Sequence, residues 1–478
     1  MKIRLYMLLL FPVIFLCSAC EEWLDVKPKS QIESAVLFEA EAGFKDALAG
    51  IYMKMTEPAM YGREMTFGVV DVLGAAYSTV GSVIYTPVRN YDYTHQDVEP
   101  VINRMWQNTY NTIANVNSLI KNLLVAEKGM FSTDNYEVIL GEAYGLRGFL
   151  HFDLLRLFAP SYLAGATSLS IPYVTEYSFK ITPEHAVSVV IDSVLNDLQR
   201  AASLLQQSDP MVTGRTITYL IDDNYLSNRK IHLNYYAIKA LMARVYLYKG
   251  DKSNAAQCAE EIIASRKFSW TRVDNIAVSV DARRDRTFST EHVFALDIQK
   301  MEENITGRLR ETTSNAYLLT CNTAYLNRVF PSLTDWRRLY FWTPQSSSQN
   351  YHTKLWQPEG MPDTLTCRMP MVRLPELYLI SAEASLPGNP AKARTYLAEL
   401  KTNRGIENWT PVSTTAESLQ EEIVQEYLRE FIAEGVMFFM YKRLDAGSIF
   451  GASTAFNKSK YVLPMPMEEI EFGQRNTN

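Results

Sequence analysis

Cysteine, histidine and long apolar runs are all scarce in this sequence. Five cysteines among 478 residues are too few for a disulfide framework, although Cys321 and Cys367 could form one bridge. Cys258, in the helix-forming stretch "NAAQCAEEIIA", is predicted to be a small buried side chain. The six histidines include no HExxH motif and no close pair, so metal hydrolysis lacks support and we expect no metal or cofactor.

An excess of positive charge is also lacking. The chain has 47 Lys and Arg against 53 Asp and Glu, a net charge of −6, and no basic block that would favour binding to nucleic acid. No GxSxG, GxGxxG or Walker A motif is present, which argues against the common nucleophile and nucleotide sites. The polar triplet Asp222–Asn224 lacks the further spaced carboxylates of a calcium loop.

The N-terminus has the features of an export signal. Lys2 and Arg4 accompany an apolar run of twelve residues, Leu5–Leu16, which is too short to span a bilayer but suits a signal peptide. The small residues of "CSAC" then lead to Cys20, which looks like the lipobox of a bacterial lipoprotein. We expect residues 1–19, with Cys17, to be removed and Cys20 to be lipidated. The alternative is an ordinary secretory signal cut near the same place without a lipid.

Helical periodicity and helix-boundary residues dominate the rest of the chain. "DNYEVILGEAYGLRGFLHFDLLRLFAP" places Asp134 and Glu137 as a capping box and ends before Pro160. "TPEHAVSVVIDSVLNDLQRAASLL" predicts a helix with Thr182 as N-cap and Pro183 at its first position. Each stretch repeats apolar residues at helical spacing, so each predicts a helix packed on one face.

Two stretches predict helical hairpins. In "HLNYYAIKALMARVYLYKGDKSNAAQCAEEIIASR", Gly250 ends the first helix and Asp251 caps the second. "LPELYLISAEASLPGNPAKARTYLAELKTNRGI" repeats this form, with Asn389 as the cap after the Pro-Gly break. A last helix, "TTAESLQEEIVQEYLREFIAEG", opens with Thr414 and Glu417 as a capping box. These lengths and turns are typical of tetratricopeptide-type repeats, and generic helix-hairpin packing is the alternative.

Two segments between the helical blocks are rich in aromatics and lack a helical period. The first, residues 71–100, contains Tyr77, Tyr85, Tyr91 and Tyr93. The second runs from about residue 269 to 370, and residues 317–356 within it hold four Tyr and three Trp. Aromatic loops on a helical scaffold are the organisation expected of a binding protein.

A family resemblance follows from several motifs in a fixed order. They are the lipobox followed by "EEWLDVKP", then "WQNTYNTIANVNSLI", "EAYGLRGFLHFDLLRLFAP" with "IPYV", "KALMARVYLYKGD", "MVRLPELYLISAEA" with "NRGI", "EYLREFIAEG" and "YVLPMPMEEI". With these motifs the chain resembles the SusD/RagB family of outer-membrane nutrient-binding lipoproteins. One departure is the Met437-Phe438 pair, where the family usually has Arg-Trp.

The resemblance implies a mainly α fold. Tetratricopeptide-like helical hairpins would form a right-handed superhelical scaffold, and loop-rich segments with small β-hairpins would carry the ligand surface. It also implies a signal peptide at 1–19 and a single body over 20–478, with an N-terminal half of about 20–225 and a C-terminal half of about 265–478.

The resemblance further implies a role without catalysis. The chain would be an outer-membrane lipoprotein, palmitate-bearing at Cys20 and facing the cell surface. It would serve nutrient uptake in polysaccharide utilisation by binding an oligosaccharide and delivering it to a SusC-like TonB-dependent transporter. The acidic residues of "CEEWLD" resemble a surface-export signal.

Sugar recognition suggests which side chains to expect at the site. A flat aromatic ring covers the apolar face of a pyranose, and polar groups satisfy its hydroxyls. The candidate ligand residues come from two clusters, one in each aromatic segment: Tyr77, Tyr85, Arg89, Asn90, Tyr91, Asp92, Tyr93, and Trp336, Tyr340, Trp342. For each aromatic the alternative is packing against the helical core.

Two other function classes remain open on the sequence alone. A helical-repeat scaffold or lid would bind a peptide or protein, with its aromatic loops packed inward. A glycoside hydrolase would need two converging carboxylates. Glu430 and Glu434 lie one helical turn apart, but Arg429 and Lys442 are nearby as charge partners, so we interpret this pair as structural and expect no catalytic residues.

Overall fold

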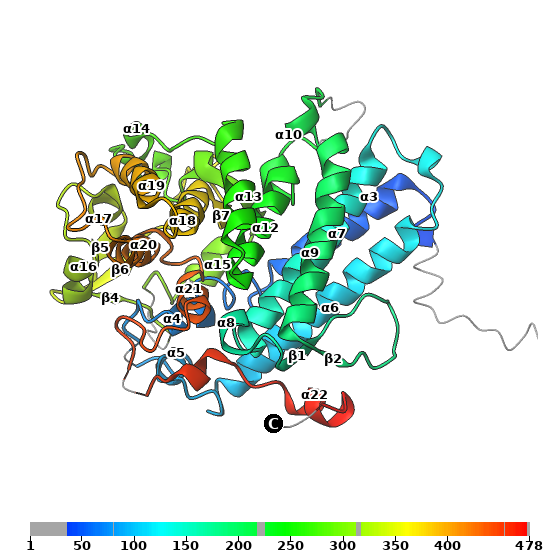
Figure 1. Cartoon of the computed structure of the whole chain (residues 1–478), viewed down its shortest axis with the longest axis horizontal. Coiled ribbons are helices and arrows are strands. Elements are labelled where there is room, and N and C mark those ends of the chain that lie inside the picture. Colours follow the sequence, from blue (N-terminus) through cyan, green and yellow to red (C-terminus); the bar gives the residue numbers. More distant parts are fainter. Residues whose placement is uncertain (1–35, 80, 218–224, 312–316, 454, 476–478) are drawn as a thin grey trace, which may run out of the picture.

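The computed structural model describes residues 36–79, 81–217, 225–311, 317–453 and 455–475 (Figure 1). The predicted signal peptide, the lipidation at Cys20 and the triplet Asp222–Asn224 lie outside these residues.

Helices make up most of the described chain. The longer helices are α3 (Glu41–Met55), α6 (Glu99–Leu123), α7 (Asn135–Phe158), α9 (Val187–Ser208), α12 (Tyr235–Lys249), α13 (Lys252–Ser265), α18 (Leu374–Ser385), α19 (Pro390–Thr402) and α20 (Ala416–Glu430). The shorter helices are α4 (Val69–Leu73), α5 (Tyr85–Arg89), α8 (Tyr162–Gly165), α10 (Pro210–Thr213), α14 (Val273–Ile276), α15 (Met301–Ile305), α16 (Thr323–Val329), α17 (Trp336–Tyr340), α21 (Met437–Arg443) and α22 (Met467–Phe472). Short 3-10 turns are η1 (Lys128–Met130), η2 (Arg229–Ile231), η3 (Asp281–Arg283), η4 (Ser289–Glu291) and η5 (Lys458–Tyr461).

The strands form small antiparallel sheets. The first pairs β1 (Leu169–Pro172) with β2 (Glu184–Ala186), and the second pairs β3 (His292–Asp297) with β7 (Arg368–Arg373). In the third, β6 (Gln349–His352) lies between β4 (Cys321–Asn322) and β5 (Trp342–Pro344).

Successive long helices pack on one another and form the scaffold. α6 packs on α7, α7 on α9, α9 on α12, α12 on α13, and α13 on α18, which also contacts α19 and α20 (Figure 1). Glycines on α7 permit the closest approaches, because a Cβ at Gly145 would lie 2.3 Å from the Ile238 Cδ1 of α12. The predicted mainly α, tetratricopeptide-like fold is confirmed.

Most predicted helix boundaries lie within one residue of those observed. Gly250 ends α12 with a left-handed φ of 86°, and the side chains of Asp251 and Asn389 cap α13 and α19. α20 is capped by Thr415, one residue after the predicted cap. The prediction at Thr182 is wrong: residues 184–186 pair with β1 as a strand, and α9 begins only at Val187.

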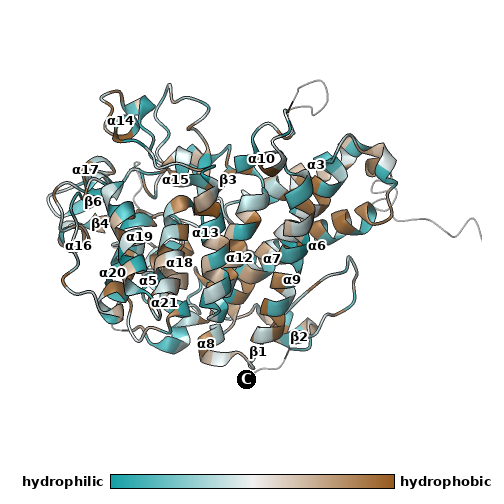
Figure 2. Cartoon of the chain, turned by 45° about the horizontal axis from the view of Figure 1, so that its top comes forward, coloured by the Kyte–Doolittle hydropathy of each residue, from teal (hydrophilic) through white to brown (hydrophobic). Residues whose placement is uncertain are grey.

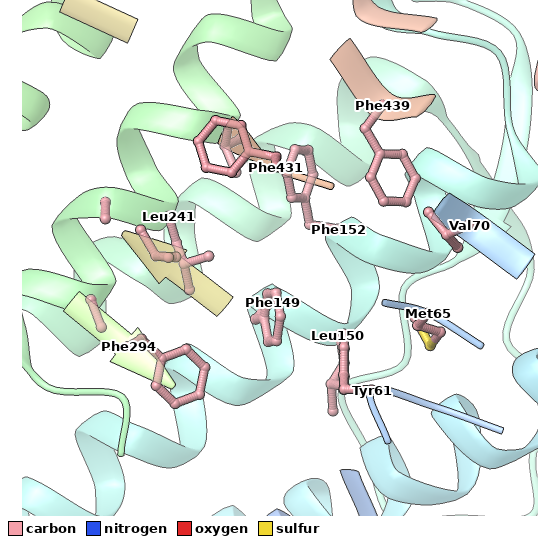
Figure 3. Close-up of a cluster of buried hydrophobic side chains, with 14 of the residues drawn as sticks. Tyr61, Met65, Val70, Phe149, Leu150, Phe152, Leu241, Phe294, Phe431 and Phe439 are labelled. Carbon is pink, nitrogen blue, oxygen red and sulfur yellow. The ribbon is translucent and has the colours of Figure 1, made fainter. Parts of the chain in front are cut away.

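One hydrophobic cluster extends through the described chain from Phe44 to Leu463. The long helices carry mixed hydrophobic and hydrophilic residues (Figure 2). In the centre of the cluster, Phe149 and Phe152 of α7 lie near Phe294 of β3 and Phe439 of α21 (Figure 3). Segments from both ends of the sequence therefore share this core.

A buried network of charges surrounds Glu430, at the end of α20. Glu430 Oε1 accepts from Arg373 at 2.5 Å and from Arg404 at 2.9 Å, and its Oε2 accepts from Arg337 at 2.9 Å. Burial alone would raise the pKa of Glu430, but the three guanidinium groups hold it well below its usual range. The whole network, here called the Glu430 network, consists of Glu291, Asp335, Glu422, Glu426, Glu430 and Glu434 with Arg337, Lys354, Arg373, Lys401, Arg404 and Arg429.

A second buried cluster lies around Glu142 on α7. Its carboxylate pairs with Arg229 and accepts hydrogen bonds from Tyr52 at 2.7 Å and from His232 at 3.1 Å. Burial raises the pKa of Glu142, but the charges of Arg229 and His232 and these hydrogen bonds outweigh burial and lower it to about 2.

We expect Glu430→Gln to lower the free energy of unfolding by about 3–5 kcal/mol, since it leaves buried arginines without a counter-charge. Glu421→Gln, an exposed position on the same helix, is the matched control and is expected to change stability by about 0.5 kcal/mol or less. Urea unfolding of both variants measures the difference. Equal stability of the two would show that the network is not needed for folding.

The depressed pKa of Glu142 predicts a loss of stability in acid. Its contribution is complete above the unfolded pKa near 4.5 and disappears as pH falls toward about 2, a change of roughly 3 kcal/mol. Glu142→Gln should therefore flatten the dependence of unfolding free energy on pH between about 5 and 2, while the exposed Glu127→Gln should not. Denaturant titrations at steps across this range test the difference, and unchanged slopes in Glu142→Gln would contradict it.

Candidate functional site

A cavity of about 370 Å³ joins the two predicted aromatic segments. We call it the loop pocket. It lies where α4 and α5 meet β4 and α16, at the left of Figure 1. Its lining consists of Ala75, Ala76, Tyr77, Ser78, Thr79, Thr86, Arg89, Asn90, Asn322, Tyr325 and Gly451.

Contacts between distant parts of the chain hold the loop pocket together. Ser78 pairs with Thr320 through both backbone N–H groups, at 2.6 and 3.3 Å. The Cys321 thiol donates to the carbonyl oxygen of Ala76 at 3.0 Å. Arg89, in the last turn of α5, donates to the carbonyl oxygen of Gly451 at 2.8 Å. Three separate segments thereby form one lining.

Asp71 precedes the first residue of the loop pocket lining, Ala75, by four positions. It is fully buried on α4 and accepts hydrogen bonds from the backbone N–H groups of Ala433, at 2.8 Å, and Gly435, at 3.1 Å. Both residues have a left-handed φ, of 66° and 67°, so Asp71 fixes a tight turn directly after α20. Burial raises the pKa of Asp71 to about 7, although the two N–H donors lower it.

The tyrosines of the first segment mostly serve the core. Tyr85 is 1%, Tyr91 0% and Tyr93 7% exposed, and none of the three lines the loop pocket. Their hydroxyls donate to Glu64, to the Leu73 carbonyl and to the Lys460 carbonyl, respectively. These rings present no face to a ligand in this structure because they pack inward. Tyr77 belongs to the lining of the loop pocket, but at 2% exposed it is also almost wholly covered by protein.

The polar candidates of the first segment lie at or next to the loop pocket. Arg89 and Asn90 are in its lining. Asp92 is exposed outside the lining, and its carboxylate accepts from the Thr94 hydroxyl at 3.2 Å.

The aromatic residues of the second cluster lie elsewhere. Trp336 and Tyr340 pack against Phe341 and its neighbours, a small satellite of the core. Trp342 is half-buried on β5, where its ring lies 4.5 Å from His352. None of the three lines the loop pocket. All three are half-buried and pack against protein on one side.

Sequence reasoning missed several lining residues. Tyr325 and Asn322 lie in the aromatic-dense window 317–356, so composition pointed to their region but not to them. The small residues Ser78, Thr79 and Thr86 belong to the first loop segment and have no distinctive spacing. No sequence pattern indicated Gly451, because it contacts Arg89 only in the folded chain.

A second cavity, of about 470 Å³, is a weaker candidate. It is lined by Asn228, Lys230, Ser289, Thr290, Asp363, Thr364 and Arg368 and has no aromatic side chain. Arg368 is paired with Asp297 at 2.8 Å, and Asp363 lies in the lining beside Lys230. The loop pocket alone of these two cavities combines aromatic rings with hydrogen-bonding groups.

The carboxylates considered for hydrolysis are enclosed by cations. Glu434 accepts from Lys354 at 2.7 Å and from Arg373 at 2.7 Å, and Glu430 is held by arginines as described above. The expected partners were wrong: Arg429 pairs with Glu422 and Glu426, and Lys442 donates to the carbonyl oxygens of Arg156 and Tyr461. This environment suits a structural role for the pair.

The remaining thiols and metal candidates add no site within the described residues. Cys258, Cys321 and Cys367 are free thiols, so the possible bridge between Cys321 and Cys367 is absent. In this part of the chain, no group of His, Cys, Asp and Glu is arranged to hold a metal ion. Here too, no helix is both long and apolar enough to cross a membrane.

Two family models match the chain. Residues 22–247 match the model described as "Starch-binding associating with outer membrane", and residues 281–472 match the model described as "SusD family". Two curated relatives from Formosa agariphila, "SusD-like protein P25" and "SusD-like protein P38", are each 23% identical to the chain. The matches cover 42% and 53% of this chain, and 38% and 44% of these relatives, so less than half of either relative is spanned.

Solved structures share the fold over nearly the whole length. A SusD superfamily protein from Bacteroides thetaiotaomicron matches with a TM-score of 0.72 at 22% identity, covering 91% of this chain and 98% of that one. Surface glycan-binding protein A from Bacteroides fluxus matches with a TM-score of 0.67 at 18% identity, covering 92% and 98%.

The buried carboxyl of Asp71 predicts a pH effect opposite to that of Glu142. A raised pKa means that its contribution to stability is complete below about 3.8 and is lost as pH rises through about 7, a change of up to roughly 4 kcal/mol. Asp71→Asn cannot ionise, so its unfolding free energy should vary less between pH 4 and 8 than that of the parent chain. Urea titrations across this range give the measurement, with Asp92→Asn as the exposed control. A parent-like pH slope in Asp71→Asn would sink this prediction.

Proposed function

The chain belongs to the SusD family, and from this membership and the loop pocket we propose that it binds an oligosaccharide at the bacterial cell surface. The observation that carries the proposal is the composition of the loop pocket, where two tyrosines stand among amide, hydroxyl and guanidinium groups. The relative named as a surface glycan-binding protein supports it.

The lining suits a sugar for physical reasons. A pyranose has an apolar C–H face and a rim of hydroxyls, so its site needs both ring surface and hydrogen-bonding groups. The half-buried Tyr325 supplies ring surface and the almost fully buried Tyr77 forms part of the wall, while Asn90 and Asn322 are exposed polar side chains in the lining. The cavity is within the size range of small-molecule sites.

In this proposal the chain captures its ligand without chemical change. The carboxylates that could support glycoside hydrolysis are buried in the Glu430 network, where they cannot meet a substrate. The chain would be held in the outer membrane by acyl chains on Cys20 and would pass its ligand to a SusC-like TonB-dependent transporter. The lipobox, "CEEWLD" and the family model described as associating with the outer membrane support this part.

Binding of oligosaccharides should depend on the loop pocket and not on the second aromatic cluster. Asn90→Ala combined with Tyr325→Phe is expected to weaken binding by about 10-fold or more, because each lost hydrogen bond contributes about 1 kcal/mol. Isothermal titration of the detergent-solubilised chain, against ligands found in an oligosaccharide and peptide screen, gives the affinities.

Two variants serve as controls for this experiment. Asp92→Ala changes an exposed residue of the same loop outside the lining, and Trp336→Phe changes a ring of the second cluster. Both are expected to bind like the parent chain. Loss of binding in Trp336→Phe with unchanged affinity in the pocket variant would move the site to the second cluster. Binding of peptides only would favour the scaffold alternative.

A further inference from the structure

Among the residues that the structure describes, Arg89 is the only charged side chain in the lining of the loop pocket. It is half-buried at the end of α5. One of its terminal N–H groups donates to the Gly451 carbonyl at 2.8 Å, and its Nε is buried without a hydrogen-bond partner in the described structure. Arg89 forms no ion pair with any of the described residues. A cation is thus held in the cavity by a neutral contact alone.

Several of the more deeply buried arginines in the described chain have carboxylate partners, whereas the half-buried Arg308, like Arg89, donates to a backbone carbonyl. Arg63 pairs with Glu64 at 2.5 Å, Arg244 with Glu376 at 2.7 Å, and Arg443 with Glu383 at 2.6 Å. Such pairing is expected because removing a guanidinium from water is costly unless an opposite charge offsets the loss. The chain has a net charge of −6, yet no carboxylate of the described residues pairs with Arg89. An anionic group of a bound ligand would supply the missing counter-charge.

Two other polar groups of the pocket are disposed as hydrogen-bond donors. Asn322 uses its Oδ1 to cap α16, accepting from the Ala324 N–H at 2.8 Å, which leaves its NH₂ group available. The Tyr325 hydroxyl is buried without a partner in the described chain. Burial raises the pKa of Tyr325 well above its usual value, despite the opposing charge of Arg89, so this hydroxyl keeps its proton and can donate.

Two further charged groups lie outside the lining. The Arg328 guanidinium lies over the Phe450 ring at 4.6 Å, and the centre of that ring lies 5.2 Å from the centre of the Tyr325 ring. Asp71 is the other, acidic group. It lies outside the lining, and its carboxylate accepts hydrogen bonds from the N–H groups of Ala433 and Gly435.

We propose that the loop pocket selects acidic glycans, with a carboxylate or sulfate of the ligand paired to Arg89 and hydrogen-bonded by the Asn322 amide and the Tyr325 hydroxyl. This inference rests on the proposed function of the same site and adds the chemical class of its ligand. Charge-assisted bonds between a guanidinium and such an anion are among the strongest that a protein site forms.

Matched pairs of glycans test the proposal. The panel contains oligogalacturonides with their methyl esters, sulfated galactans with their desulfated forms, and glucuronate-bearing xylans with their carboxyl-reduced forms. The detergent-solubilised full chain is titrated with each member. We expect the acidic member of at least one pair to bind about 10- to 100-fold more tightly than its neutral form. The pair that shows this difference tells whether the anion is a carboxylate or a sulfate.

Variants assign the preference to Arg89. Arg89→Gln should abolish the difference between acidic and neutral members, because it should weaken binding of the acidic member more than that of the neutral one. Arg89→Lys, which keeps the charge without the fork of donors, should retain part of it. Lys230→Gln removes a half-buried cation from the second cavity and should leave the preference intact. Thermal unfolding checks that each variant is folded.

The outcomes separate the inference from the function on which it rests. Equal or tighter binding of the neutral members by the parent chain overturns the acidic preference while oligosaccharide binding stands. The acidic preference is likewise overturned if Arg89→Gln is folded and keeps it, or if Lys230→Gln loses it. Absence of binding to every glycan of the panel overturns both proposals. If Arg89→Gln fails to fold, the comparison of acidic with neutral glycans in the parent chain still tests the acidic preference.

Discussion

Glu430 is fully buried, and its charge is balanced by Arg337, Arg373 and Arg404. These arginines come from α17, the end of β7 and the turn after α19, so one carboxylate fixes four segments of the C-terminal half. A network of charges buried at this depth is stable only when every charged side chain in it keeps its partners. The geometry of these segments is therefore set jointly, and the loss of one partner affects all of them.

Glu430 is also connected to the loop pocket, through the turn that follows it in the chain. Directly after Glu430 the chain turns through Ala433 and Gly435, and their N–H groups bind Asp71. Asp71 lies in α4, shortly before Ala75, Ala76 and Tyr77, which enter the pocket lining. Buried hydrogen bonds at Asp71, together with the chain on either side of them, thus connect the helical scaffold with the surface that we assign to the ligand.

Aromatic residues in this protein divide into those that pack and those that line the site. Tyr85, Tyr91 and Tyr93 are buried in the core, and Trp336 packs against a small satellite cluster. Tyr325 is half-buried in the lining of the cavity, and Tyr77 belongs to both groups, since it is in the lining and only 2% exposed. Local composition cannot separate the two groups, since a ring has the same apolar surface whether it meets protein or sugar. Whether a ring is covered by protein or faces the cavity depends on how its backbone segment is placed in the folded chain.

The sequence by itself determined the features that depend on nearby residues. Gly250, Asp251 and Asn389 set helix ends because caps and left-handed turns act within one turn of chain, and the periodic apolar faces and ordered motifs indicated the fold and the family. Contacts between remote segments were decided only by the tertiary structure. The hydrogen bonds from Arg89 to Gly451 and from Ala433 to Asp71 each join residues 362 positions apart. The strand at 184–186 replaced a predicted helical turn because β1 was there to pair with it. No local pattern encodes such partners, because the free energy that selects them arises only when both surfaces are brought together.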